Sequence, residues 1–175
     1  NLNDVFQKSL NYCHINTEIN NYDFLKKKKD NNFSSNLSVK KWLHIHLDEK
    51  WFNDLYIKKY TNIHPNYDGF IDFLNKIPLH NHILITTGII DFELLDELKN
   101  KYFKKINQKI FLRKESNRLT YFIYKPTFDD LESLLRNSKI LFSCHGAITH
   151  AANSFDVKIV DIIEKSREKG IPFLM

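Results

Sequence analysis

The alternation of short apolar runs with amphipathic segments constrains the fold of this chain more than any other feature. Apolar runs of strand length occur at residues 42–47, 82–88, 139–142 and 157–163. Segments with apolar side chains at helical spacing lie between them, at residues 68–74, 91–102 and 127–135. Strands that are apolar on both faces and alternate with helices are typical of a covered parallel sheet. The sequence therefore predicts an α/β fold, a doubly wound, Rossmann-like parallel sheet with helices on both faces.

Local signals refine this prediction in the middle of the chain. Asp91 is expected to cap the helix that follows it, and Thr127 is expected to form a capping box with Asp130. Two further apolar runs, residues 110–112 and 121–124, flank the polar residues 113–118. One of these two runs pairs with the sheet, and the sequence leaves open which.

Length and composition bound the domain organisation. The 175 residues and the 42% hydrophobic fraction suit one domain with a real core. Residues 16–38 are rich in Asn, Lys and Ser, so residues 1–39 are expected to lead into a domain at 40–175. No run reaches the length of a membrane span, and no signal peptide is visible. Cys13 and Cys144 are too few for a disulfide framework, so a reducing, cytoplasmic environment is expected.

The charge distribution argues against nucleic acid as a partner. The formal net charge is +5, but outside residues 26–29 and 99–105 the lysines alternate with acidic residues. A nucleic-acid-binding surface would show a basic stripe with interleaved aromatic residues, and none is seen. A surface that favours anionic ligands, or the anionic face of a membrane, remains compatible with this charge.

The turn at residues 143–152 carries the most chemistry. It lies between two predicted strands, and a helix of small residues is expected to begin near Ala147. Backbone N–H groups at such a turn face the carboxyl edge of the sheet, where open α/β folds bind ligands. His145, Gly146, Thr149 and His150 crowd the same turn. An anionic ligand, most simply a phosphate, is the predicted occupant.

Two other loops are predicted at the same edge of the sheet. One follows the first strand and contains Lys50, which supplies a mobile positive charge for a phosphate. The other contains Thr86, Thr87 and Gly88, which add hydroxyl groups and a tight turn. Because parallel strands present their carboxyl ends together, at least two of the three loops are expected side by side.

Several other kinds of site are disfavoured. Neither G-x-G-x-x-G nor G-x-x-x-x-G-K-[ST] occurs, which argues against a dehydrogenase or a P-loop ATPase. His44 and His46 fall on one face of a strand without a carboxylate or Cys at ligand spacing, so they are expected to be structural and no metal site is predicted. Cys144 next to His145 is expected to be a small buried residue rather than a nucleophile.

With the segments 47–51 and 144–163 in view, the chain resembles the carboxyl-terminal domain of GT-B glycosyltransferases, and most closely glycosyltransferase family 9, the heptosyltransferase family. In that family a Lys and an aromatic residue follow the first strand of this domain, as Lys50 and Trp51 do here. The later signature of the family is D-[ST]-G-x-x-H-x-A. His150 and Ala152 fall in register with it, whereas His145, Gly146 and Ala147 depart from it. The segment is also similar to the H-G-A-x-x-T-[HN] signature of another GT-B group, although it is one residue shorter.

The resemblance spans about residues 40–163 and implies a nucleotide-sugar-binding domain. Residues 1–39 would then be the trailing end of a missing amino-terminal domain plus a linker, and the catalytic base is expected in that missing domain. The implied function is sugar transfer from a nucleotide-sugar to a glycan or glycolipid acceptor in cell-surface polysaccharide or lipopolysaccharide biosynthesis, with no cofactor besides the donor. The implied location is the cytoplasm, with peripheral association at the inner face of the membrane as an option. The nucleotide-sugar is expected to contact Lys50, Thr86, Thr87, Gly88, His145, Gly146, Ala147, Thr149 and His150.

Two alternatives stay open from the sequence. The basic segment Lys101 to Lys105 motivates a non-catalytic α/β module that binds an anionic ligand or a protein partner. A different α/β enzyme, such as a sugar-nucleotide epimerase of GT-B-like fold, is the other.

Overall fold

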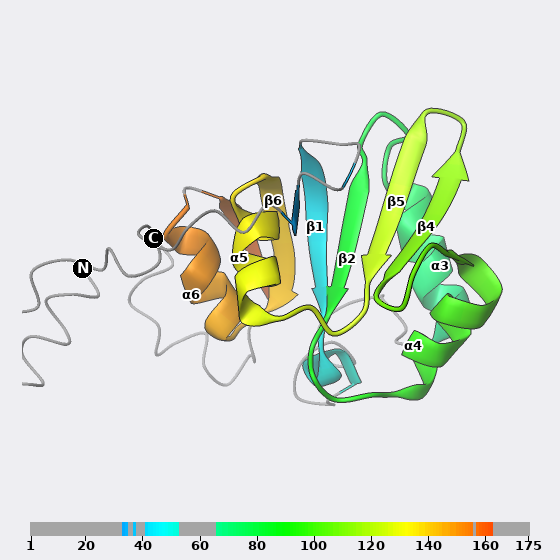
Figure 1. The fold of residues 1–175 in the computed structure, drawn as a ribbon, viewed down its shortest axis with the longest axis horizontal. Coiled ribbons are helices and arrows are strands. Elements are labelled where there is room, and N and C mark those ends of the chain that lie inside the picture. The colour runs from blue at the N-terminus through cyan, green and yellow to red at the C-terminus, as the bar shows by residue number, and fades with distance from the viewer. Residues whose placement is uncertain (1–32, 35–36, 38–40, 53–65, 156, 163–175) are drawn as a thin grey trace, which may run out of the picture. The chain divides into compact units, whose positions relative to one another are not determined.

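The computed structural model describes residues 33–34, 37, 41–52, 66–155 and 157–162, which all belong to the second of the two units into which the chain divides, residues 32–175. A seven-stranded sheet forms the framework of these described residues (Figure 1). Its strands are β1 (Trp42–Leu47), β2 (Ile83–Thr87), β3 (Lys104–Lys105), β4 (Ile110–Glu115), β5 (Arg118–Ile123), β6 (Ser138–Cys144) and β7 (Lys158–Ile162). The predicted α/β class with a largely parallel sheet is confirmed.

The strand order shows where a ligand site belongs. The sheet runs β3-β4-β5-β2-β1-β6-β7, and the pairs β5–β2, β2–β1, β1–β6 and β6–β7 are parallel. In chain order these five parallel strands are the third, second, first, fourth and fifth, which is the order of a doubly wound, Rossmann-like sheet. The direction of winding reverses between β1 and β6, so the crevice at their carboxyl ends is the expected ligand position.

The two apolar runs left open by the sequence both join the sheet. The run at 121–124 contributes to β5, which pairs parallel to β2, and the run at 110–112 begins β4, which pairs antiparallel to β5. A tight turn joins them, and Ser116 adopts a positive φ of 48° within it. The polar residues between the runs therefore continue both strands instead of separating them.

The buried Arg118 explains why a charged residue begins β5. Its side chain donates hydrogen bonds to the carbonyl oxygens of Leu74 (3.2 Å) and Ile77 (3.0 Å), and it pairs with Glu115. Arg118 is 1% exposed. The two carbonyls belong to the end of α3 (Tyr67–Lys76), where helical carbonyls lack partners within the helix. Arg118 therefore fastens the end of this helix to the hairpin.

Helices cover both faces of the sheet, as predicted (Figure 1). On one face, α3, α4 (Glu93–Glu97) and the π-helical turn η3 (Leu98–Tyr102) pack on the sheet through Phe70, Leu74 and Leu95. These side chains meet Ile45 and Ile83 of the central strands. Because side chains alternate along a strand, Leu84 and its neighbours point to the opposite face.

The opposite face packs against α5 (Phe128–Leu135) and α6 (Ala147–Asn153). Leu134 of α5 joins the cluster that contains Leu84 and Trp42. The described residues of the predicted leading segment pack there too. Leu37 is buried in this cluster, and the Ser34 N–H donates to a side chain of α5. The remaining predictions for residues 1–39 lie outside the described residues.

Of the two helix caps predicted from the sequence, one is confirmed and the other is wrong. Thr127 caps α5 and forms the expected capping box, because its hydroxyl accepts from the Asp130 N–H and the Asp130 carboxylate accepts from the Thr127 N–H. The prediction that Asp91 caps the next helix is wrong. That helix begins at Glu93, and the Asp91 carboxylate instead accepts from Tyr124 and Lys125 (2.6 Å each). Asp91 therefore ties the loop after β2 to the loop after β5.

Candidate functional site

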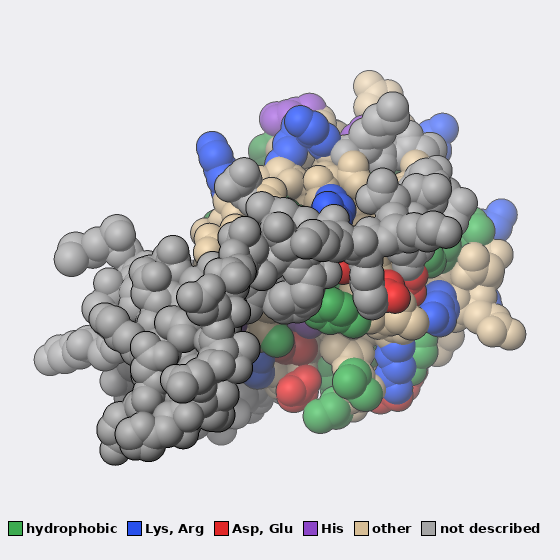
Figure 2. Space-filling model, turned by 60° about the vertical axis from the view of Figure 1, so that its left-hand side comes forward, with side chains coloured by type: hydrophobic (Ala, Val, Ile, Leu, Met, Phe, Trp, Pro, Cys, Tyr) green, Lys and Arg blue, Asp and Glu red, His purple; other side chains and the backbone are tan. Residues whose placement is uncertain are grey.

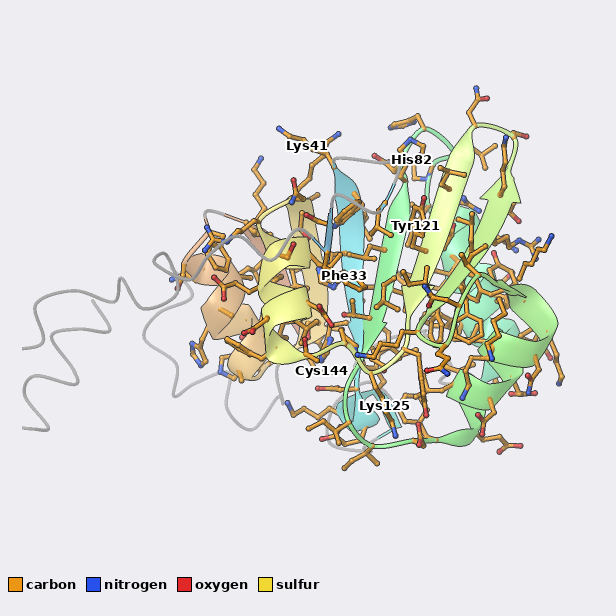
Figure 3. The ribbon with its side chains drawn as sticks, viewed as in Figure 1. Phe33, Lys41, His82, Tyr121, Lys125 and Cys144 are labelled. Atoms are coloured by element: carbon orange, nitrogen blue, oxygen red, sulfur yellow. The ribbon has the colours of Figure 1, made fainter. Side chains whose placement is uncertain are left out.

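A cleft of about 670 Å³ opens at the carboxyl edge of the sheet, at the ends of the adjacent strands β1 and β6. The loops that follow β1, β2, β5 and β6 border it, and α5 and α6 form one wall. Figure 3 shows Lys125 and Cys144 at this edge of the sheet, with Lys41 and His82 at the opposite edge. The volume lies in the range of small-molecule pockets.

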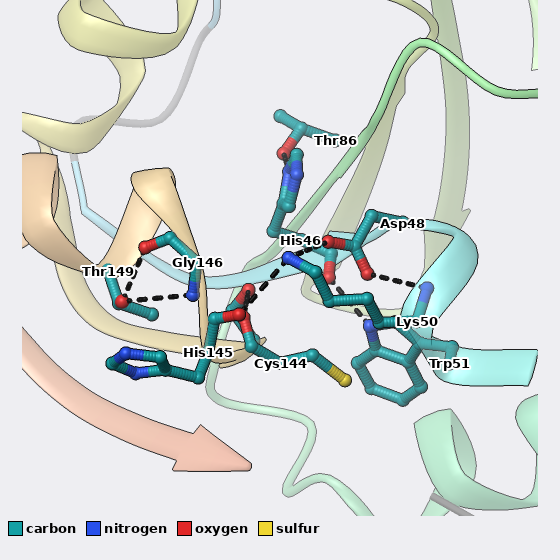
Figure 4. A network of polar contacts seen from close by, with 10 residues as sticks. His46, Asp48, Lys50, Trp51, Thr86, Cys144, His145, Gly146 and Thr149 are labelled. Atoms are coloured by element: carbon teal, nitrogen blue, oxygen red, sulfur yellow. Dashed lines mark hydrogen bonds and ion pairs between the residues drawn. The ribbon is translucent and has the colours of Figure 1, made fainter. Parts of the chain in front are cut away.

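Lys50 connects the loop after β1 to the turn after β6. It lies in the short helical turn η2 (Glu49–Phe52), and its Nζ donates to the His145 carbonyl oxygen at 3.1 Å (Figure 4). The same Nζ lies 3.3 Å from Asp48 Oδ2, while Asp48 Oδ1 accepts from the Lys50 backbone N–H at 3.1 Å. The structure thus brings two of the three predicted loops side by side. Asp48, which the sequence reasoning did not select, positions the lysine.

Gly146 leaves the space that Lys50 occupies. A Cβ atom at this position would lie 2.5 Å from Lys50 Nζ, so any other residue would displace the ammonium group. Its backbone is extended, with φ of 176°, so the glycine is required for space and not for a left-handed conformation. Thr149 fixes the turn, because its hydroxyl donates to the Gly146 carbonyl at 2.7 Å. The helix begins at Ala147, as predicted.

The cleft carries charges of both signs. Asp48, Glu49 and Glu132 border it together with Lys50 and Lys125. Burial raises the pKa of the Asp48 carboxyl, and the neighbouring Lys50 ammonium partly offsets this shift. Lys50 thus brings a positive charge to a crevice where an acidic group already balances it, so an anionic ligand has to compete with Asp48 for the lysine.

The hydroxyl groups of Thr86 and Thr87, which were predicted to contact a ligand, form hydrogen bonds within the protein. Thr87 borders the cleft, but its hydroxyl accepts from the Lys125 N–H (2.8 Å) and donates to the Gly88 carbonyl (3.1 Å). These bonds hold Lys125, which has a positive φ of 45°, at the rim. Gly88 also borders the cleft. Thr86 does not, and its hydroxyl lies between two histidines.

The remaining predicted residues of the turn after β6 do not border the cleft. His145 Nδ1 lies 2.5 Å from Asp161 Oδ2 of β7, and its ring meets the His150 ring edge-on at a centroid distance of 5.3 Å. His150 is exposed. Thr149 is buried, and its hydroxyl is hydrogen-bonded to Gly146. Of this turn only Gly146, Ala147 and the following helix line the cleft. Asp161 lies sixteen residues after His145, so no local pattern indicates their pairing.

His44 and His46 form a buried polar chain with Thr86. His44 Nε2 lies 2.8 Å and His46 Nδ1 lies 2.9 Å from Thr86 Oγ1, and His44 Nδ1 lies 3.1 Å from Ser138 Oγ. Burial lowers the pKa of both imidazoles, that of His46 to about 4. His44 is fully buried and structural, as predicted. His46 also belongs to the lining of the cleft, a role that sequence reasoning missed.

Apolar side chains gather at the mouth of the cleft. Ile90 and Phe128 border it and are 55% and 54% exposed. Figure 2 shows hydrophobic and acidic side chains beside one another along the lower edge of the described surface. The site therefore combines a polar floor with an apolar rim, which is common in sites for small organic ligands.

Cys144 is not a nucleophile. It is fully buried, and desolvation raises the pKa of its thiol well above the usual range. The described residues contain no group of three or more His, Cys, Asp and Glu side chains that would hold a metal ion. None of the helices in the described part of the chain has the length and apolar character that crossing a membrane requires.

A scan against protein-family models, a search of curated proteins and a search of solved structures found no match to this chain. Its function is therefore inferred from the geometry of the cleft together with the sequence motifs.

Proposed function

We propose that this chain is the donor-binding half of a GT-B glycosyltransferase resembling glycosyltransferase family 9. In this proposal it takes part in sugar transfer during cell-surface polysaccharide or lipopolysaccharide biosynthesis. The observation that carries the proposal is the position of Lys50, a cation at the switch point of a doubly wound sheet, lodged over the Gly146 turn at the cleft. This is the place where a diphosphate meets both a lysine and backbone N–H groups.

The chemistry assigned to Lys50 is charge stabilisation. When the bond between the sugar and the diphosphate breaks, negative charge develops on the leaving nucleotide. A fixed ammonium group beside that charge stabilises the transition state by roughly 2–4 kcal/mol. Asp48 holds the ammonium in place before the ligand arrives. The proposal assigns donor binding, and not the catalytic base, to these residues.

The rim of the cleft suits a nucleobase. The exposed ring of Phe128 and the exposed side chain of Ile90 offer apolar surface at its mouth, on the side of α5 and of the loop after β2. A base that packs there would place the attached diphosphate toward Lys50. Of the residues predicted from the sequence, the proposal keeps Lys50, Thr87, Gly88, Gly146 and Ala147 as lining of the donor site.

Calorimetric titration of the chain with UDP, ADP, GDP and CMP tests the proposal. One of these is expected to bind, and Lys50→Met is expected to weaken its binding about 10- to 100-fold, the weight of one charged hydrogen bond. Lys114→Met, which removes an exposed lysine on β4, serves as the matched control for net charge. Binding that Lys50→Met leaves unchanged, or the failure of all four to bind a chain shown to be folded by circular dichroism, contradicts the proposal.

The alternative of an anion-binding module based on the lysines of residues 101–105 is less favoured. Lys99 and Lys101 lie 2.6 Å from the carboxylates of Asp96 and Glu97, respectively. Of the three lysines that motivated the alternative, the pair with Glu97 neutralises one, Lys101. Binding of anionic lipid or nucleic acid that Lys104→Glu abolishes would restore it.

A further inference from the structure

The hydrogen-bond chain behind the cleft fixes which nitrogen of His46 carries a proton. Its far end is Ser138, whose Oγ lies 3.1 Å from Trp42 Nε1, 3.1 Å from His44 Nδ1 and 3.0 Å from the Leu134 carbonyl oxygen. The indole N–H can only donate, and the carbonyl can only accept. The single hydroxyl hydrogen of Ser138 must therefore go to the carbonyl, since two acceptor oxygens 3.0 Å apart would otherwise repel each other.

The assignment then propagates along the chain. Ser138 Oγ accepts from His44, so the His44 proton is on Nδ1 and its Nε2 is an acceptor. Thr86 donates its only hydroxyl hydrogen to His44 Nε2 at 2.8 Å. The Thr86 oxygen must then accept from His46 Nδ1 at 2.9 Å. His46 consequently carries its proton on Nδ1 and has a lone pair on Nε2.

This lone pair has no partner within the described part of the chain. The other hydrogen bond of His46 uses its backbone carbonyl, which accepts from Trp51 Nε1 at 2.8 Å. His46 is only 7% exposed and borders the cleft, yet its Nε2 is not among the fully enclosed side-chain atoms that lack a partner. The accessible edge of the ring is therefore the Nε2 edge, on the side of the cleft.

An imidazole nitrogen with a lone pair accepts a hydrogen bond and repels an anionic oxygen. The nearby ammonium of Lys50 attracts an anionic oxygen. Its positive charge also disfavours a second proton on the His46 ring. The floor thus presents two neighbouring positions, one for an anion and one for a neutral hydrogen-bond donor.

We propose that His46 Nε2 accepts a hydrogen bond from a sugar hydroxyl next to the diphosphate of the bound nucleotide, and that His46 thereby determines which sugar the cleft takes. This inference rests on the proposed donor-binding function and names the group that selects its substrate. Both the ribose and the transferred sugar carry hydroxyls beside the diphosphate. Either hydroxyl can donate the hydrogen bond that His46 Nε2 accepts, and the binding experiment distinguishes the ribose from the transferred sugar.

Two variants of His46 isolate the Nε2 acceptor. In His46→Asn the side-chain amide lies where Nδ1 was and still donates to Thr86, but nothing replaces Nε2. In His46→Gln the longer side chain places its amide near the Nε2 position and keeps an acceptor there. A loss of binding in the Asn variant that the Gln variant largely restores is therefore a property of the acceptor and not of the fold.

The titration uses the nucleoside diphosphate that binds best, its 2′-deoxy and 3′-deoxy forms, and its glucose conjugate. His46→Asn is expected to weaken binding about fivefold, the weight of one neutral hydrogen bond. If His46 contacts the ribose, one of the two deoxy forms binds the wild type about fivefold more weakly than the parent nucleotide does. His46→Asn then weakens the binding of that deoxy form no further. If His46 contacts the transferred sugar, His46→Asn weakens the binding of the glucose conjugate alone. Equal binding of every compound to the wild type and His46→Asn overturns the inference and leaves the donor-binding function standing.

A ligand-free measurement tests the same inference separately. Nitrogen NMR of the histidine-labelled chain is expected to show His46, assigned by comparison with His46→Asn, protonated on Nδ1 and not on Nε2. A proton on Nε2 overturns the inference whatever the binding results. A wild type that binds none of the four nucleotides overturns the proposed function, and this inference with it.

Discussion

Acidification is expected to destabilise the fold through its buried histidines. The pKa of His46 falls from an ordinary 6.5 to about 4 because burial disfavours the imidazolium. Between these two values the unfolded chain binds more protons than the folded one, so stability is complete above 6.5 and falls as the pH falls toward 4. At about pH 5 this linkage costs about 2 kcal/mol for His46 alone. His44 acts in the same direction.

Urea unfolding followed by circular dichroism, at about pH 7.5 and about pH 5, measures this loss. His46→Asn is expected to lose about 2 kcal/mol less than the wild type over the same interval. His80→Asn, which replaces an exposed histidine, is expected to lose as much as the wild type. The raised pKa of Asp48 works in the opposite direction but is common to all three proteins. An equal loss in the wild type and in His46→Asn would refute the reasoning.

Five substitutions, two of them controls, test other contacts. Arg118→Met is expected to lower the free energy of unfolding by about 3–5 kcal/mol, because two helix carbonyls lose a buried donor and Glu115 loses one of its two arginine partners. Arg113→Met, at a partly exposed position, should cost under about 1 kcal/mol. Thr86→Val leaves one nitrogen of each of two buried imidazoles without its partner and should cost about 2–4 kcal/mol, whereas Thr86→Ser keeps the hydroxyl and should cost about 1 kcal/mol. Both pairs are compared by urea unfolding, and equal costs within a pair would contradict these assignments. Gly146→Ala should leave the free energy of unfolding nearly unchanged but weaken nucleotide binding about tenfold, because the new methyl group displaces the Lys50 ammonium. Calorimetry measures this affinity. An unchanged affinity would show that the position of the ammonium group is unimportant.

Local patterns predicted much of this fold. The first strand has the predicted bounds, 42–47, and the capping box of Thr127 is present as expected. Both depend on neighbouring residues, which a sequence displays directly. The Gly146 turn and the start of its helix at Ala147 were predictable for the same reason. The meeting of Lys50 with this turn followed from one topological rule, that parallel strands end at one edge.

What the sequence did not reveal depends on the register between strands. Thr86 was expected in a loop that offers its hydroxyl to a ligand, but it lies within β2 opposite His46 of β1, whose Nδ1 lies 2.9 Å from that hydroxyl. His46 was expected to be purely structural because no carboxylate or Cys stands at ligand spacing from it, although the loop after its strand was predicted to lie at the ligand edge of the sheet. The pairing of His145 with Asp161 across β6 and β7 has the same origin. Arg118, a charged residue, concealed the start of β5 because its partners are distant carbonyls.

The central position of β1 has a consequence for synthesis on the ribosome. Of the strands in the described part of the chain, β1 emerges first, and β2, β4 and β5 can assemble on one side of it before β6 exists. The other side of β1 then offers unpaired backbone groups until β6, which begins 96 residues after Trp42, has been made. An unpaired edge of this kind invites association with other chains. Ribosomes that stall after β5 would therefore release an aggregation-prone half-sheet, and the ligand cleft would form only after β6 and the start of α6 have been made.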